Sequence, residues 1–142
     1  MNRIVLDTSV AVKWFFEEED ERHAASIAAN IRGDALEAIV PEFFYVECAN
    51  AFRGKIKKKI CSLEEAHRAF SVLQNLPLKR HLHEDLADIA LDHAAIYDIS
   101  VYDALYVSLA EIYAAPLITA DAALLKACKG RFDFIQHLRD YK

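Results

Sequence analysis

Apolar residues in this chain fall into short runs that alternate with longer stretches of helical spacing. The short runs are rich in β-branched residues and predict strands. The longer stretches repeat apolar side chains every three or four positions, as a helix with one buried face does. We expect strands at 3–6, 36–40, 77–79, 116–119 and 132–135. We expect helices at 8–15, 20–31, 41–57, 63–75, 84–97 and 101–114, and a seventh that begins at 121 or 122.

Strands and helices that alternate in this way predict an α/β fold with a parallel sheet, because a helix is the usual crossover between two parallel strands. We expect a three-layer α/β/α sandwich with about five strands in the central sheet and about seven helices. A length of 142 residues is typical of one domain, so we expect a single domain over 1–142.

Several residues at the ends of these segments set the expected helix boundaries. Thr8 or Ser9 can cap the first helix, and Gly33 is a C-cap for the second. Pro41 suits the first turn of the third helix, where its missing N–H is not needed. The sequence Ser-Leu-Glu-Glu at 62–65 matches a capping box and opens the fourth helix.

Two of the apolar strands end in an acid with hydroxyl residues beside it. Asp7 follows the first strand and precedes Thr8 and Ser9, and Asp121 follows Thr119. Because the carboxyl ends of parallel strands meet at one edge of a sheet, we expect Asp7 and Asp121 to lie close together. The three hydroxyl residues either bind carboxylates and ligand water or serve as a helix cap and a strand end.

Two further acids lie on predicted inward faces of helices, Glu47 on the third and Asp103 near the start of the sixth. A buried carboxylate without a partner is costly. Glu47 therefore either binds a cation or lies at the border of its apolar face and reaches water. The expected neighbours are Phe43, Val46, Asn50 and Ala51 on the face of Glu47, and Tyr106, Val107 and Ala110 on that of Asp103.

Four converging acids would repel one another unless cations lay between them. Ligand sets made only of oxygen suit Mg2+ or Mn2+ rather than zinc or copper. Four carboxylates can hold one or two such ions. Metal ions held in this way can activate water and stabilise a phosphodiester during in-line attack.

The charge distribution bears on nucleic-acid binding in two ways. With 17 Lys and Arg against 22 Asp and Glu, the net charge is −5, which disfavours a protein that coats nucleic acid. The acidic run at 17–21 predicts an exposed loop that leads into a helix start. A basic run in the third helix is either a solvated helix end or a guide for RNA phosphates. It consists of Arg53, Lys55, Lys57, Lys58 and Lys59.

Cysteine usage and hydropathy predict a cytoplasmic protein with no membrane segment. The three cysteines are odd in number and lack C-x-x-C spacing, which favours reduced thiols over a disulfide framework or a zinc site. No apolar run approaches the roughly 18 residues of a membrane span. The hydrophobic fraction of 54% is high for a small domain and favours an apolar surface for a partner.

Four segments together resemble the PIN-domain family. Residues 4–9, Ile-Val-Leu-Asp-Thr-Ser, resemble the opening of such a domain. Residues 41–51 resemble the segment that supplies its glutamate, with an asparagine one turn later. Residues 100–110 resemble its third acidic segment, and 117–121 resemble its closing T-x-D element. The resemblance covers nearly the whole chain, and the four motifs occur in the family's order.

The resemblance implies a sheet in the order 3-2-1-4-5 and a metal-dependent nuclease site. It makes Asp7, Glu47, Asp103 and Asp121 the expected metal ligands and catalytic residues. The expected supporting residues are Thr8, Ser9, Asn50 and Thr119. In length and compactness the chain is similar to VapC-type toxins of bacterial and archaeal toxin–antitoxin pairs. That similarity implies RNA cleavage, a cognate antitoxin and commonly a homodimer.

The leading hypothesis is therefore a Mg2+- or Mn2+-dependent endoribonuclease of the toxin type. The alternative is a non-catalytic module of the same fold that acts through its antitoxin or through RNA. A haloacid-dehalogenase-like phosphatase also opens on strand–Asp–Thr, but it needs a second Asp where this chain has Ser9. No Gly-rich phosphate loop is present in the sequence, which disfavours a nucleotide-binding switch.

Overall fold

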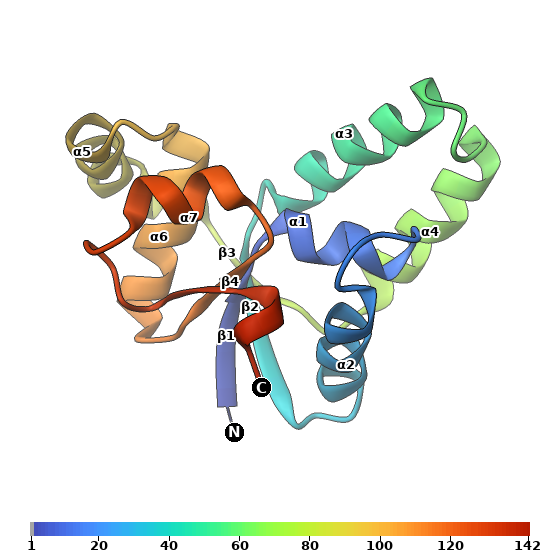
Figure 1. Cartoon of the computed structure of the whole chain (residues 1–142), viewed down its shortest axis with the longest axis horizontal. Coiled ribbons are helices and arrows are strands. Elements are labelled where there is room, and N and C mark those ends of the chain that lie inside the picture. The colour runs from blue at the N-terminus through green and yellow to red at the C-terminus, as the bar shows by residue number, and fades with distance from the viewer. Residues whose placement is uncertain (1) are drawn as a thin grey trace.

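Five parallel strands form one sheet at the centre of the molecule (Figure 1). The computed structural model describes residues 2–142 apart from the side chain of His83, so Met1 of the expected domain lies outside it. The sheet order is β3-β2-β1-β4-β5, and every pair is parallel, as predicted. The strands are β1 Asn2–Leu6, β2 Leu36–Pro41, β3 Lys79–His81, β4 Leu117–Thr119 and β5 Ile135–His137.

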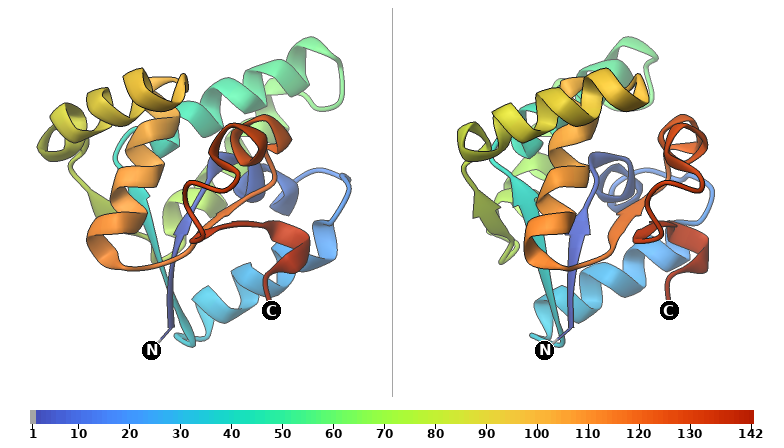
Figure 2. Two further views of the ribbon diagram at one scale, coloured as in Figure 1. Left: turned by 60° about the vertical axis from the view of Figure 1, so that its left-hand side comes forward. Right: turned by 90° about the vertical axis from the view of Figure 1, so that its left-hand side faces the viewer.

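Helices cover both faces of the sheet, which confirms the three-layer prediction. Helices α5 and α6 pack together on one side, where α6 contacts β1 and β2 (Figure 2). Helices α1 to α4 lie on the other side (Figure 1). The α-helices are α1 Thr8–Ala11, α2 Glu21–Arg32, α3 Phe44–Lys57, α4 Leu63–Asn75, α5 Ala87–Tyr97, α6 Val101–Tyr113 and α7 Ala122–Cys128. Short 3-10 turns occur at Val12–Trp14, His83–Leu86 and Leu138–Asp140.

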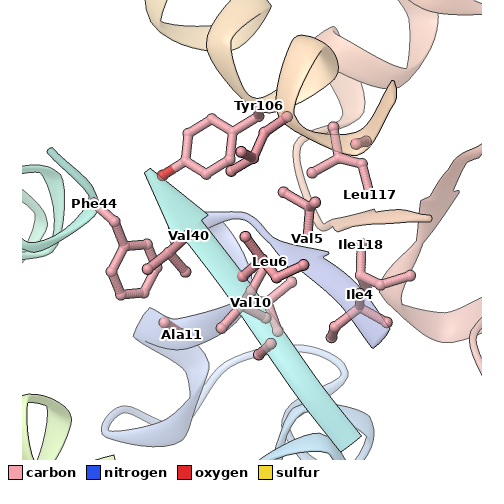
Figure 3. Close-up of a cluster of buried hydrophobic side chains, with 14 of the residues drawn as sticks. Ile4, Val5, Leu6, Val10, Ala11, Val40, Phe44, Tyr106, Leu117 and Ile118 are labelled. Atoms are coloured by element: carbon pink, nitrogen blue, oxygen red, sulfur yellow. The ribbon is translucent and has the colours of Figure 1, made fainter. Parts of the chain in front are cut away.

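The core lies on both faces of the three inner strands β2, β1 and β4. Ile4, Val5 and Leu6 are fully buried, as expected for a parallel strand covered on both sides. Figure 3 shows these side chains with Val10 and Ile118 in one cluster, bordered by Phe44 from α3 and Tyr106 from α6. The continuous apolar run before Asp7 is therefore explained by burial of the strand.

The third helix begins three residues later than the sequence predicted. Pro41 is the last residue of β2 and pairs with His81 of β3, whereas α3 begins at Phe44. The backbone angle that proline imposes is also compatible with extended structure. The amide of Glu42 then donates to the carbonyl of His81 at 3.0 Å, which continues the strand pairing past the proline.

The predicted inward face of α3 was only partly right, since Phe43, Glu47 and Ala51 are half-buried. The buried residues are Phe44, Cys48 and Phe52, whereas Val46 is 71% exposed and Asn50 is exposed. A shift of one position turns a helix face by about 100°. The face with residues 44, 48 and 52 is buried because it supplies two large aromatic rings to the core.

The remaining boundaries agree with the sequence to within a few residues. The capping box is present: the Ser62 hydroxyl accepts from the amide of Glu65 at 3.1 Å, and the Glu65 carboxylate accepts from the amide of Ser62 at 3.0 Å. Gly33 is the C-cap of α2. The edge strands β3 and β5 start two and three residues later than expected. Cys48, Cys61 and Cys128 are free thiols.

Across residues 2–142, none of the helices combines the length and apolar character needed to cross a membrane.

Candidate active site at the carboxyl edge of the sheet

Asp7 is buried at the carboxyl end of β1, with only 7% of its surface exposed. Its Oδ2 atom accepts two hydrogen bonds, from the Ser9 hydroxyl at 2.6 Å and from the Thr119 hydroxyl at 2.8 Å. Thr119 ends the neighbouring strand β4. The side chain of Asp7 therefore links the ends of two adjacent strands.

Ser9 and Thr119 each make a second hydrogen bond that fixes the chain after β4. The Ser9 hydroxyl accepts from the amide of Ala120 at 2.9 Å, and the Thr119 hydroxyl accepts from the amide of Asp121 at 3.0 Å. Both hydroxyls bind the Asp7 carboxylate and a backbone amide, and Thr119 is at the same time the last residue of its strand. Neither Thr8 nor Ser9 caps the first helix, since the N-cap position belongs to Asp7.

Glu47 lies in the first turn of α3 and is held by two hydroxyl groups. Its Oε1 atom accepts from the Tyr106 hydroxyl at 2.7 Å and from the Thr8 hydroxyl at 3.1 Å. The oxygens of Thr8 and Tyr106 are themselves 2.9 Å apart. Glu47 is half-buried and has polar partners from the start of α1 and from α6, so it is not simply a solvated border residue.

Asp103 and Asp121 also lie at helix starts. Asp103 is in the first turn of α6, and its amide donates to the Ser100 hydroxyl at 3.0 Å. Asp121 caps α7, because its Oδ1 atom accepts from the amides of Ala123 at 2.9 Å and Leu124 at 3.2 Å. All four predicted acids therefore lie at the N-terminal ends of helices, at the N-cap or in the first turn.

The acids lie close enough for their charges to act on one another. Burial raises the pKa of Asp7, and the charge of Asp121 raises it further. Burial also raises the pKa of Glu47, with smaller contributions from the charges of Asp7 and Asp103. Burial, followed by the charges of Asp7 and Asp121, raises the pKa of Asp103 to about 6. Burial and mutual repulsion thus disfavour the ionised forms of these three acids, Asp7, Glu47 and Asp103.

The donor chemistry of this cluster fits a hard divalent cation. Every candidate ligand is a carboxylate oxygen, and a bound cation would favour the ionised forms that burial and mutual repulsion disfavour. The side chains do not form a finished cage. Among the side chains that the structure describes, which leave out His83, no three His, Cys, Asp or Glu are arranged closely enough to hold an ion.

Two neighbouring groups keep their protons in this setting. Burial raises the pKa of the Cys48 thiol to about 12, so Cys48 is not a thiolate ligand despite its place beside Glu47. Burial also raises the pKa of Tyr106 well above its ordinary value, with the charges of Asp7 and Glu47 adding to the effect. Tyr106 therefore remains a neutral hydrogen-bond donor.

Tyr106 is the residue at this site that sequence reasoning missed. The sequence placed it among the apolar neighbours of Asp103 and gave it no further role. The available signal was its spacing: a tyrosine three positions after an acid lies on the same helix face as that acid. Conversely, the predicted supporting residue Asn50 is exposed on α3, away from that helix's buried face.

The basic run of α3 divides into one paired residue and four exposed ones. The Lys55 ammonium lies 3.3 Å from the Glu18 carboxylate and 5.3 Å from the ring centre of Phe16. The exposed residues are Arg53, Lys57, Lys58 and Lys59. Arg53 and Lys57 are in α3, and Lys58 and Lys59 lie in the connection from α3 to α4, which Figure 1 shows as a turn between the two helices.

The acidic run at 17–21 is only partly the exposed loop that was predicted. The Glu18 carboxylate also pairs with Lys13 at 3.7 Å, and Arg139 lies 3.6 Å from Asp20 and 3.9 Å from Glu19. Glu18 and Asp20 are half-buried, whereas Glu17, Glu19 and Glu21 are exposed. Ion pairs from three other segments therefore offset much of this charge.

The fold and the four acids define a PIN domain. The family model described as PIN domain matches residues 4–130, which is most of the chain, and the chain belongs to this family. Among curated proteins it is similar to Ribonuclease VapC12 from two strains of Mycobacterium tuberculosis. Each is 29% identical over 124 residues, which cover 87% of this chain and 91% of the relative.

Solved structures with the same fold agree with this assignment. A protein from Pyrobaculum aerophilum, PAE2754, has a TM-score of 0.71 at 20% identity and covers 97% of this chain and 92% of its own. A toxin–antitoxin complex from Klebsiella pneumoniae has a TM-score of 0.67 at 15% identity, and the match covers 95% of this chain and 97% of the other. VapC20 of Mycobacterium tuberculosis, a toxin that cleaves the sarcin–ricin loop, has a TM-score of 0.66 at 15% identity, with coverage of 87% and 94%.

Proposed function

We propose that this chain is a metal-dependent endoribonuclease and the toxin of a toxin–antitoxin pair. The observation that carries the proposal is the buried Asp7, whose raised pKa and hydroxyl clamp occur beside three further acids. PIN-domain ribonucleases are generally metal-dependent. The relative with 29% identity is a ribonuclease, which supports RNA as the substrate.

The proposed metal ligands are Asp7, Glu47, Asp103 and Asp121, which would hold one or two Mg2+ or Mn2+ ions. Bound there, the metal would supply charge that activates water and stabilises the phosphodiester under attack. The protein's own part is to orient the ligands. Ser9 and Thr119 fix Asp7, and the amides at the start of α7 fix Asp121. Ser100 caps the helix start that carries Asp103.

We assign the exposed cations of α3 to RNA guidance. Arg53 and Lys57 are on the same helix as Glu47, and Lys58 and Lys59 directly follow that helix. Phosphate contacts of such residues make RNA binding salt-dependent. Lys55 is left out of this set because Glu18 already pairs with it.

The proposed partners are an antitoxin and a second copy of the chain, in the cytoplasm. The Klebsiella neighbour is itself a toxin–antitoxin complex, which supports the first. Exposed apolar side chains on α5 and α6 support a further protein contact. They include Ile89, Leu91, Ile96 and Ile112. Three free thiols are typical of a reducing compartment.

The test is cleavage of structured RNAs by the purified chain with Mg2+, with Mn2+ and with EDTA. We expect cleavage that needs the metal and that is lost in Asp7→Asn. Cleavage that survives EDTA, or an Asp7→Asn protein that cuts as fast as the wild type, contradicts the proposal. A matched control is Asp133→Asn, which removes a carboxylate outside the site without affecting cleavage.

A non-catalytic binding module of the same fold is the second candidate. The observations that favour it are the net charge of −5 and the exposed apolar side chains on α5 and α6. Calorimetry with Mn2+ distinguishes the two candidates: heat of binding supports the nuclease, and its absence together with uncut RNA supports the module.

A further inference from the structure

Three carboxylates of the site share one pattern of hydrogen bonding. On each of them, two donors converge on a single oxygen: Oδ2 of Asp7, Oε1 of Glu47 and Oδ1 of Asp121. The Asp7 carboxylate also accepts from the backbone amide of Ser9. The second oxygen of Glu47 takes no part in the two bonds to that residue. The donors are Ser9 and Thr119 for Asp7, Thr8 and Tyr106 for Glu47, and the amides of Ala123 and Leu124 for Asp121.

Glu47 differs from the other two in where its shortest hydrogen bond comes from. Tyr106 belongs to α6, a different helix, and lies one turn after Asp103 on the same face of that helix. The bond from Tyr106 to Glu47 therefore joins an acid of α3 to the helix that carries another acid of the site. Rotation of Glu47 about its side-chain bonds is restricted by this contact.

The shortest distance makes Tyr106 the main donor to Glu47. Thr8, Tyr106 and Glu47 make three close oxygen contacts, of 2.7, 2.9 and 3.1 Å, but the two hydroxyls carry only two protons. The shortest contact is the one from Tyr106 to Glu47. Thr8 donates either to Glu47 or to Tyr106, and in the second case it strengthens the Tyr106 bond.

The ring of Tyr106 is fixed by packing. Tyr106 is 0% exposed, and its ring packs edge-to-face against Phe43 with the ring centres 5.6 Å apart. In this packing the Tyr106 hydroxyl points at Glu47 and Thr8. The ring packing and the hydrogen bond to Glu47 therefore require the same side-chain conformation.

We propose that Tyr106 is a positioning residue, which occupies Oε1 of Glu47 and leaves Oε2 as the single oxygen that Glu47 offers to a metal ion. The role rests on the proposed function, because it concerns the same site. Ligands that offer one oxygen suit Mg2+ and Mn2+, whereas Ca2+ accepts bidentate carboxylates and more ligands. Tyr106 therefore contributes to the choice of metal.

The test compares two tyrosine substitutions on the same helix of the full-length chain. Tyr106→Phe removes the hydroxyl that holds Glu47. Tyr113→Phe removes a hydroxyl that contacts Nδ1 of His81 at 3.0 Å and is the matched control. For both variants and the wild type, calorimetry gives the affinities for Mn2+ and Ca2+, and thermal unfolding gives the stability.

For Tyr106→Phe we expect about tenfold weaker Mn2+ binding, as is typical when a group that orients a metal ligand is removed. The ratio of the Mn2+ affinity to the Ca2+ affinity should fall, since both oxygens of Glu47 become available. In RNA cleavage, the Mn2+ concentration for half-maximal rate should rise about tenfold. The rate at saturating Mn2+ should fall much less. Tyr113→Phe should leave both affinities unchanged.

Three outcomes overturn the role of Tyr106. The first is a Tyr106→Phe protein with wild-type affinity for both metals. The second is an equal loss of affinity in Tyr106→Phe and Tyr113→Phe, which would mean that α6 is merely loosened. The third is a larger loss of Mn2+ affinity in Thr8→Val than in Tyr106→Phe, which would assign the role to Thr8. If Tyr106→Phe does not fold, a loss of Mn2+ affinity in Thr8→Val alone has the same meaning. A wild-type chain that binds no Mn2+ overturns the proposed function and this role with it.

Discussion

The two sides of the candidate site hold their acids by different means. On the strand side, Asp7 and Asp121 are fixed by groups at the start of α1, at the end of β4 and at the start of α7. On the helix side, the shortest hydrogen bond of Glu47 comes from Tyr106, which belongs to a different helix, α6. Asp103 has its helix start capped, and its pKa is raised by burial and by the charges of Asp7 and Asp121.

This difference indicates that the strand side is formed with the sheet itself, whereas the helix side depends on how α3 and α6 pack. A change in the strand side should therefore affect both stability and activity. A change in the helix side should affect metal binding first. Substitutions can therefore separate the two sides by their effects on cleavage and on stability.

The largest effect is expected for Asp7→Asn. Loss of a metal-binding carboxylate removes several kcal/mol of transition-state stabilisation, so RNA cleavage should fall by about 100-fold or more. Because burial raises the pKa of Asp7, its ionised form costs free energy in the metal-free fold, and the neutral amide should raise the melting temperature in EDTA. Lower activity together with a lower melting temperature would contradict this assignment.

A smaller effect is expected for Ser9→Ala, which breaks the clamp on the strand side. The variant loses the 2.6 Å bond to Asp7 and leaves the amide of Ala120 without its acceptor. We expect a loss of about 1–2 kcal/mol in the free energy of unfolding, measured by urea denaturation. The matched control is Ser71→Ala on the exposed side of α4, which should change stability by less than about 0.5 kcal/mol.

The pH dependence of stability tests the electrostatics of the helix side. The pKa of Asp103 is raised to about 6 in the fold, against about 3.9 in an unfolded chain. The folded state then binds the proton more tightly between about pH 4 and 6, so stability falls as pH rises through this window. In EDTA, the melting temperature of the wild type should drop relative to that of Asp103→Asn over this range. Parallel curves for the two proteins would refute this.

The smallest effects are expected at the basic corner of α3. Each of Lys57→Gln and Lys58→Gln should weaken RNA binding slightly and reduce the slope of log affinity against log salt by about one. Lys55→Gln is the matched control: Glu18 already pairs with Lys55, so its substitution should leave the slope nearly unchanged. Equal slopes for all three variants would remove the distinction between paired and exposed cations.

The acids of the strand side could be predicted from the sequence because a local pattern marks each of them, although the bond from Thr119 to Asp7 joins residues 112 positions apart. An apolar run that stops at an acid, followed by hydroxyl residues, identifies the carboxyl end of a buried parallel strand. Asp7 and Asp121 are on the adjacent strands β1 and β4, as their duplicate pattern predicts. The sheet order and the family were confirmed as well.

The helix side could be predicted only in part, because it depends on tertiary packing. The spacing placed Glu47 inward, but it also placed Val46 and Asn50 inward, and those two are exposed. Which face of α3 is buried was decided by Phe44 and Phe52. The role of Tyr106 could not be predicted from spacing alone, because its partner comes from another helix.

Long-range ion pairs and short edge strands account for the other differences. Nothing in the local sequence pairs Lys55 with Glu18, which lies in a segment 37 residues earlier. Strands β3 and β5 have three residues each, too few for an alternating pattern to fix their boundaries.

The placement of all four acids at helix N-termini has a consequence for the net charge of the site. Each helix start contributes up to about half a positive charge, so four of them together offset up to about two of the four negative charges. One divalent ion would then bring the region close to neutral. A second would make it positive overall, at the edge of the sheet where a phosphate anion would have to bind. The backbone thus lets the site hold four acids without a lysine or arginine among its ligands.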